Sequence, residues 1–163
     1  MRHVMWIGLS LLLASGTVSA QEATFESRSL TPEAALKAAT AAMATCRKNG
    51  FQVAVAVSDR AGHALVMLRD RFAGPHTVQT AIDKAYTAIT FKMDTKSFAA
   101  VTEKGEASGI RHLPHIAALG GGLPIESGGS IVGAIGVSGA PGGEADEACA
   151  KAGVQAIGEE LEF

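Results

Sequence analysis

The glycine-rich stretch 120–139, which reads GGGLPIESGGSIVGAIGVSG, constrains the fold of this chain more than any other segment. Two short apolar runs flank the pair Gly128-Gly129, and paired glycines supply the positive φ angles that a tight hairpin turn needs. In the second run Gly133 and Gly136 interrupt β-branched residues, which is typical of a strand that another element approaches closely. The stretch therefore predicts a β-hairpin whose second strand packs against a helix or a ligand.

The first 20 residues have the pattern of a cleaved signal peptide. A basic start at Arg2 and His3 precedes an apolar run that is short for a transmembrane helix, and small residues at 18–20 form a cleavage site. An uncleaved membrane anchor is the alternative, but no stop-transfer charges follow the run. We expect an exported mature chain, residues 21–163, that is periplasmic or secreted and has no stable membrane insertion after cleavage.

The mature chain has the size and charge of one ordinary globular domain. Without Arg2, its 14 basic residues become 13 against 16 acidic ones, and they form no basic cluster, which argues against nucleic acid and anionic membranes as partners. Cys46 and Cys149 lie too far apart in the sequence for a C-x-x-C motif. Two thiols in an exported chain favour a structural disulfide over a thiolate metal site.

Apolar periodicity and turn residues predict the order α-β-β-α-α-β-β-β-α. The expected elements are a helix from Thr31-Pro32 to Asn49, strands at 51–58 and 64–69, helices at 77–91 and 95–106, short strands at 115–119, 123–125 and 131–137, and a last helix from 144 to about 161. Pro114 excludes a long helix over residues 110–119. Two hairpins joined by a helical crossover predict an antiparallel five-stranded sheet between helices.

Both cysteines lie on helical stripes that we expect to face the core. The first helix places Leu36, Ala39, Met43 and Cys46 on one side, and the last places Ala145, Cys149, Ala152, Gly153 and Ala156 on one side. The small side chains of the second stripe would let that helix pack closely.

The blocks VAVAVSDRAGH, KAYTAITFKMDT and GGLPI followed by VGAIGVSG resemble the GlcG/HbpS family of haem-binding-type proteins, which includes the C-terminal domain of PduO. The resemblance runs from about Leu30 to Glu159 and implies an α/β (α+β) fold, a profilin-like three-layer α/β/α sandwich around a five-stranded antiparallel sheet of order 2-1-5-4-3. It also implies haem binding in some members, frequent homo-oligomers and, for exported members, sensing beside a membrane sensor protein. The chain departs from the family after its second strand, where RDRFAGPHT replaces R-M-D-G-A.

The implied strand order bears on the two cysteines. In that order the first and last strands are antiparallel neighbours, so the C-terminal end of the first helix lies beside the N-terminal part of the last. Cys46 is near the first of these ends and Cys149 near the second. We therefore expect a disulfide between them.

A ligand site is expected where the loop at His76 meets the segment from Arg111 to His115, near the glycine run. Candidate haem-iron ligands are His76, His112 and His115, at most one or two of them, with Arg69, Arg71 or Arg111 for propionates, Met67 or Met93 as soft alternatives, and Gly121 and Gly122 leaving room for a flat ring. His76 could equally serve as a cap for its loop, and the methionines could be core residues. The spacing of His112 and His115 does not fit a zinc pair.

These patterns predict an exported, non-enzymatic haem or tetrapyrrole binder for haem sensing or handling. Two alternatives stay open: an enzyme or accessory factor of small hydroxy-acid (glycolate-type) metabolism, and a structural or signalling oligomer with a protein partner. The sequence has no G-x-S-x-G elbow, and its glycine run leads into a strand, which argues against nucleophilic catalysis and nucleotide binding.

Overall fold

The computed structural model describes residues 23–162, in which four strands form one antiparallel sheet of order β2-β1-β4-β3. The strands are β1 (Ala54–Asp59), β2 (Ala64–Arg69), β3 (Gly122–Ser127) and β4 (Ser130–Ser138). Two hairpins, β1–β2 and β3–β4, join where β1 pairs with β4. The signal peptide expected at residues 1–20 lies outside the described residues.

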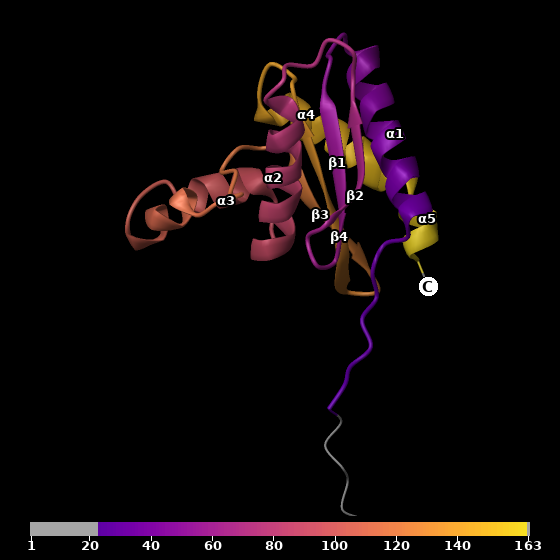
Figure 1. Ribbon diagram of the computed structural model, residues 1–163, viewed down its shortest axis with the longest axis vertical. Helices are drawn as coiled ribbons and strands as arrows, with labels where there is room; N and C mark the ends of the chain where they lie inside the picture. Colours follow the sequence, from indigo (N-terminus) through magenta and orange to yellow (C-terminus); the bar gives the residue numbers. More distant parts are fainter. Residues whose placement is uncertain (1–22, 163) are drawn as a thin grey trace, which may run out of the picture.

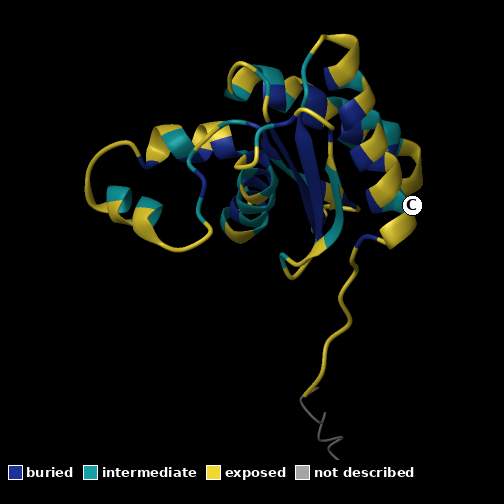
Figure 2. Cartoon of the chain, turned by 45° about the horizontal axis from the view of Figure 1, so that its top comes forward, coloured by how far each residue is buried: buried dark blue, intermediate teal, exposed yellow. Residues whose placement is uncertain are grey.

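Helices cover both faces of this sheet (Figure 1). They are α1 (Pro32–Lys48), α2 (Thr77–Phe91), α3 (Thr95–Val101), α4 (Gly143–Ala156), α5 (Gly158–Leu161) and the 3₁₀ segment η1 (Glu106–His112). The helices α1 and α4 lie side by side on one face, and α2 lies on the other (Figure 1). Figure 2 shows that burial is concentrated in the sheet and on the inner sides of these helices. The mixed α/β class with an antiparallel sheet is therefore confirmed.

The central strand β1 buries side chains on both faces, as its sequence predicts. Val55 and Val57 belong to the core shared with α1 and α4, whereas Ala54 and Ala56 pack with Ala81 of α2. Alanine on the α2 side lets that helix lie close to the sheet. The valine side chains of β1 thus face a thick apolar layer beneath α1 and α4, and its alanine side chains face a thin apolar layer beneath α2.

The expected fifth strand is absent from the described residues, because 115–119 forms a loop. Pro114 lacks the N–H that a strand ladder uses, and His115 has a φ of 63°, which is left-handed and not extended. The pairing order of the other four strands agrees with the expected one. The five-stranded detail of the fold prediction is therefore replaced by a sheet of four strands.

This change leaves β3 at the edge of the described sheet, and Pro124 protects that edge. The amide of Val137 donates to the carbonyl oxygen of Gly121 at 2.9 Å, so Gly121 turns its backbone groups toward β4. Backbone groups alternate in direction along a strand, so the odd-numbered residues 121–125 face β4 and the even-numbered ones face outward. In this register Pro124 turns its nitrogen outward, where a further strand would need a donor. A missing N–H at an exposed edge discourages pairing with another chain.

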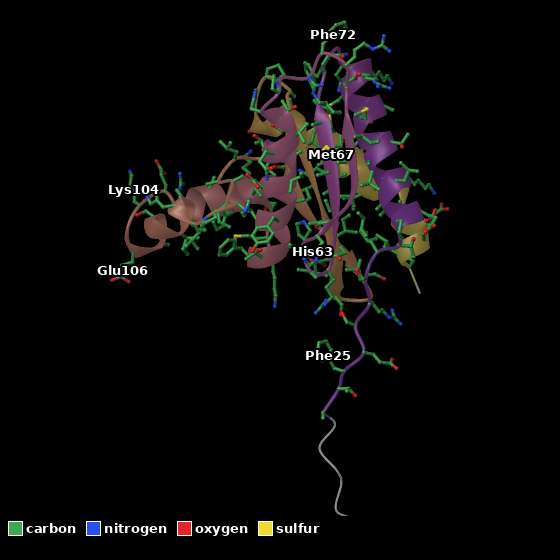
Figure 3. All side chains as sticks on the ribbon, in the orientation of Figure 1. Phe25, His63, Met67, Phe72, Lys104 and Glu106 are labelled. Carbon is green, nitrogen blue, oxygen red and sulfur yellow. A yellow bond between two sulfur atoms is a disulfide. The ribbon has the colours of Figure 1, made fainter. Side chains whose placement is uncertain are left out.

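The helical crossover departs from the expected pattern after Val101. The predicted helix 95–106 stops there, and the chain turns through Gly105, which has a φ of 80°, into η1. Residues 95–112 form an arm that projects from the body, with Lys104 and Glu106 near its tip (Figure 3). The last helix is also interrupted, since α4 ends at Ala156 and α5 follows.

A disulfide joins α1 to α4, as predicted. Cys46 and Cys149 are both fully buried, and their Cα atoms lie 5.5 Å apart. The stripe on α1 is nearly as expected, although Leu36 is 49% exposed and does not face the core. Along the part of the chain that is described, no helix is both long and apolar enough to cross a membrane.

Candidate functional site

Three loops at one end of the sheet enclose a cavity of about 610 Å³, which we call the loop cavity. The cavity is lined by residues 50–52 of the α1–β1 loop, by Phe72, Gly74 and His76 of the β2–α2 loop, and by residues 138–143 around the β4–α4 loop, with Leu119 and Gly120 closing one side. Phe72 marks this end of the molecule, and His63 lies toward the opposite end (Figure 3). Loops carried on a rigid sheet are a common place for ligand sites.

A larger groove, of about 1010 Å³, lies between β3 and the helices α4 and α5. Its apolar wall is formed by Leu123, Pro124, Val154 and Leu161, and no histidine or arginine lines it. The loop cavity is therefore the better candidate for a ligand that needs a nitrogen donor, because it contains His76.

The inner end of the loop cavity is closed by a buried ion pair. The Lys84 Nζ lies 2.8 Å from Asp146 Oδ2, and the two side chains are 3% and 5% exposed. Lys84 also donates to the carbonyl oxygen of Val137 at 2.8 Å, and the amide of Ala140 donates to Asp146 Oδ1 at 2.9 Å. Both charged groups therefore have hydrogen-bond partners in addition to each other.

At the mouth of the cavity His76 precedes the first turn of α2. Its imidazole makes no capping hydrogen bond to that helix, whereas Thr77 and Thr80 donate their hydroxyl protons to the carbonyl oxygens of Gly74 and His76. The His76 imidazole therefore does not cap α2. The ring nitrogens stay available at the mouth of the cavity.

The loop that carries His76 is anchored at its base by Arg47 and Asp70. Arg47 Nε lies 2.7 Å from Asp70 Oδ2 and Nη2 lies 3.1 Å from Oδ1. The Asp70 carboxylate is buried, and its Oδ1 also accepts from the amide of Arg71. Hydrogen bonds from the Arg47 guanidinium hold the pKa of Asp70 below its ordinary value of 3.8.

The lowered pKa of Asp70 predicts a specific acid sensitivity. A carboxyl whose pKa is lower in the folded state stabilises the fold above its unfolded pKa, and this contribution disappears as the pH falls through the folded value. We expect Asp70→Asn to be less stable than the wild type at pH 7, with a difference that shrinks below about pH 4. Urea unfolding at pH 7, 5 and 3 measures this difference, with Glu26→Gln as an exposed control. A difference that is independent of pH would contradict the prediction.

Two of the predicted propionate partners are occupied by backbone carbonyl groups. Arg69 donates from Nε to the carbonyl oxygen of Ala73 at 3.1 Å, within the β2–α2 loop. Arg111 donates from Nε to Thr102 Oγ1 at 3.0 Å and from Nη2 to the carbonyl oxygen of Ala99. Both arginines therefore brace their own loops. Arg71, beside Phe72, makes no side-chain hydrogen bond or ion pair with any described residue.

The structure does not bring the three candidate histidines together in one copy of the chain. Only His76 lines the loop cavity. His112 is exposed at the end of η1. His115 lies against the middle of α2, with its Nδ1 3.3 Å from Asp83 Oδ1 and its ring edge-on to that of Tyr86. Asp83 is seven residues after His76, so His115 lies about 10 Å further along α2 than His76, at 1.5 Å per residue.

Gly121 and Gly122 make room for the protein itself and not for a flat ring. A Cβ on Gly121 would lie 2.7 Å from the Cβ of Asp146, and one on Gly122 would lie 2.5 Å from the carbonyl oxygen of Lys84.

Neither member of the Lys84–Asp146 ion pair was identified as a site residue from the sequence. Lys84 shares the buried side of α2 with Thr77, Ala81 and Ala88, so helical periodicity could have predicted that this lysine is buried.

The fold and this cavity define an α/β sandwich with a ligand-sized site at one end of its sheet. The chain belongs to the family described as "Haem degrading protein HbpS-like", which matches residues 30–155. The resemblance to the GlcG/HbpS family is therefore confirmed.

Similar proteins support this assignment. Protein GlcG of Escherichia coli (strain K12) is 33% identical over 92 residues, which are 56% of this chain and 68% of GlcG. A crystal structure of a double mutant of Streptomyces reticuli HbpS is 39% identical with a TM-score of 0.79, covering 88% of this chain and 98% of that one. The crystal structure of the PduOC:Heme complex is 26% identical with a TM-score of 0.74, covering 79% and 95%.

Proposed function

We propose that this protein is an exported, non-enzymatic haem or tetrapyrrole binder that serves haem sensing or handling. The observation that carries the proposal is that His76 lines the loop cavity together with two large exposed apolar side chains. These are Phe72, which is 79% exposed, and Leu119, which is 58% exposed. A neutral imidazole is an ordinary axial ligand of haem iron, and large apolar side chains cover the faces of a porphyrin. Arg71 does not line the cavity, but it directly precedes Phe72 in the β2–α2 loop and is the nearby arginine that we propose for a propionate.

The similar proteins and the disulfide support the same proposal. One related structure is a haem complex, and the family description names haem. A buried disulfide is typical of proteins that fold in an oxidising compartment, which fits a periplasmic or secreted location. We also propose that the protein forms a homo-oligomer and that its partner is a membrane sensor protein. Both proposals follow from the resemblance to the GlcG/HbpS family, which implies homo-oligomers and, for exported members, sensing beside a membrane protein.

Haem titration of the mature protein tests the proposal. We expect a Soret band on binding, and we expect His76→Ala to weaken affinity by about tenfold or more, which is the loss of about 1.4 kcal/mol. His63→Ala is the matched control, because His63 is 83% exposed at the far end of the sheet. His112→Ala and His115→Ala should bind like the wild type.

The outcomes separate the function from the site. A wild type that binds no haem contradicts the function. A His76→Ala protein with the wild-type spectrum and affinity leaves the function standing and removes the site. Because the family description speaks of haem degradation, the Soret band is also followed over time with a reductant present, and steady loss of the band would contradict a purely binding role.

A further inference from the structure

We infer that the buried Lys84–Asp146 pair is the positioning device of the loop cavity, and that it serves ligand binding more than stability. The inference rests on the proposed function, because it concerns the same cavity. Lys84 and Asp146 come from α2 and α4, which lie in different layers of the sandwich. The pair therefore connects two layers at the point where the cavity is built.

Two hydrogen bonds of the pair fix the end of β4 and the middle of the β4–α4 loop. Lys84 Nζ holds the carbonyl oxygen of Val137 at the end of β4. Asp146 Oδ1 holds the amide of Ala140 in the middle of the loop, and Asp146 itself lies in the first turn of α4. The wall of the cavity formed by residues 138–143 thus takes its position from these two side chains.

The chain makes room for the pair with glycines, at positions where a Cβ would collide with it or with the neighbouring backbone. Gly121 has a φ of 115°, and a Cβ there would lie 3.0 Å from Lys84 Nζ and 2.8 Å from the carbonyl oxygen of Val137. Gly120 lies so close to Gly143 that a Cβ on it would be 3.1 Å from the carbonyl oxygen of Gly143. The glycine run of the sequence is therefore explained by the housing of this pair and of the loop beside it.

Stability alone does not account for such a pair. Desolvation of two charges offsets most or all of their attraction, and well-packed apolar residues in their place are often as stable or more so. Apolar side chains, however, cannot hold the amide of Ala140 or the carbonyl of Val137 in one direction. The directional hydrogen bonds are what the pair provides and what a replacement would lose.

The double variant Lys84→Met/Asp146→Leu separates these two roles. We expect it to unfold cooperatively with a midpoint equal to or above that of the wild type, while its haem affinity falls by about tenfold or more, as for residues that orient a ligand-binding group. Hydrogen exchange at the amide of Ala140 should become fast. The control Lys37→Met/Glu160→Leu removes an exposed pair, 53% and 49% exposed, and should change neither affinity nor exchange.

The single variant Asp146→Asn keeps an oxygen for the amide of Ala140 but leaves Lys84 without its charge partner. We expect it to be destabilised while the exchange of the Ala140 amide stays slow, because the amide oxygen of asparagine still accepts from it. It also provides the test if the double variant does not fold.

The outcomes distinguish this inference from the proposed function. Wild-type affinity together with slow exchange at Ala140 in the double variant would overturn the positioning role. In Asp146→Asn, exchange at Ala140 as fast as that of an unprotected amide would overturn it as well. If the wild type binds no haem, the proposed function fails, and the exchange of Ala140 in the two variants still decides whether the pair positions the loop.

Discussion

Replacing Cys46 and Cys149 together by alanine is expected to lower the free energy of unfolding by about 4 to 5 kcal/mol. The bond closes a loop with a sequence separation of 103 residues, so it removes many conformations from the unfolded chain. Urea unfolding of the oxidised wild type and the variant measures the difference. The slope with urea should also rise in the variant, because an uncrosslinked unfolded chain exposes more surface.

The reduced wild type is the matched control for this experiment, because it has the same side chains and differs only in the bond. Both cysteines are fully buried, so the alanine variant also loses packing around two sulfur atoms, and it should be less stable than the reduced protein. Equal midpoints for the oxidised and reduced wild type would contradict the prediction. Maleimide labelling of the denatured, non-reduced protein verifies that no free thiol was present at the start.

Features that depend on neighbouring residues could be predicted from the sequence. The hydroxyl of Thr31 accepts from the amide of Ala34 and Pro32 begins α1, as their types indicate. The two glycines at 128 and 129 both have positive φ in the β3–β4 turn. The disulfide is not such a local feature: it is expected from the strand order that the family resemblance implies, because that order places the ends of the two helices beside each other.

Features that depend on distant partners could not be predicted in the same way. The glycines at 121 and 122 indicate that something must come close to the backbone, but their types do not say whether a ligand or a buried lysine fills the space. Arg69 and Arg111 illustrate the same point, because an arginine that donates to a backbone carbonyl oxygen cannot be told in sequence from one that binds a propionate. The identity of a contact partner is tertiary information, and only the presence of a close contact is local.

The predicted fifth strand is absent from the described residues because the backbone at His115 is not extended and its side chain contacts α2. An apolar segment after Pro114 fits a short strand by composition. A left-handed His115 breaks the extended path, however, and its side chain is held against Asp83 on α2. The contact with the helix replaces the contact with the sheet edge, so the segment covers α2 and leaves β3 as the edge of the described sheet.

The substitution Gly136→Ala is expected to be the most damaging single change in the sheet. Gly136 lies in β4, between its partners in β1 and β3, and beneath α2. A Cβ there would lie 2.1 Å from the carbonyl oxygen of Ala81 and 2.7 Å from the amide nitrogen of Ala85. These are backbone atoms of α2, so no side-chain rotation can relieve the overlap and the whole helix must move outward.

Outward movement of α2 would open the thin alanine layer and displace Lys84 from Asp146. We expect a loss of about 3 kcal/mol or more in the free energy of unfolding, the upper part of the range for overpacked cores. Denaturant unfolding measures it, with Gly109→Ala as the matched control, because a Cβ on Gly109 meets no atom within 4 Å. A Gly136→Ala protein as stable as Gly109→Ala would show that α2 can lie further from the sheet. In that case the position of Lys84, and with it the inner wall of the loop cavity, would not depend on the close contact between α2 and β4.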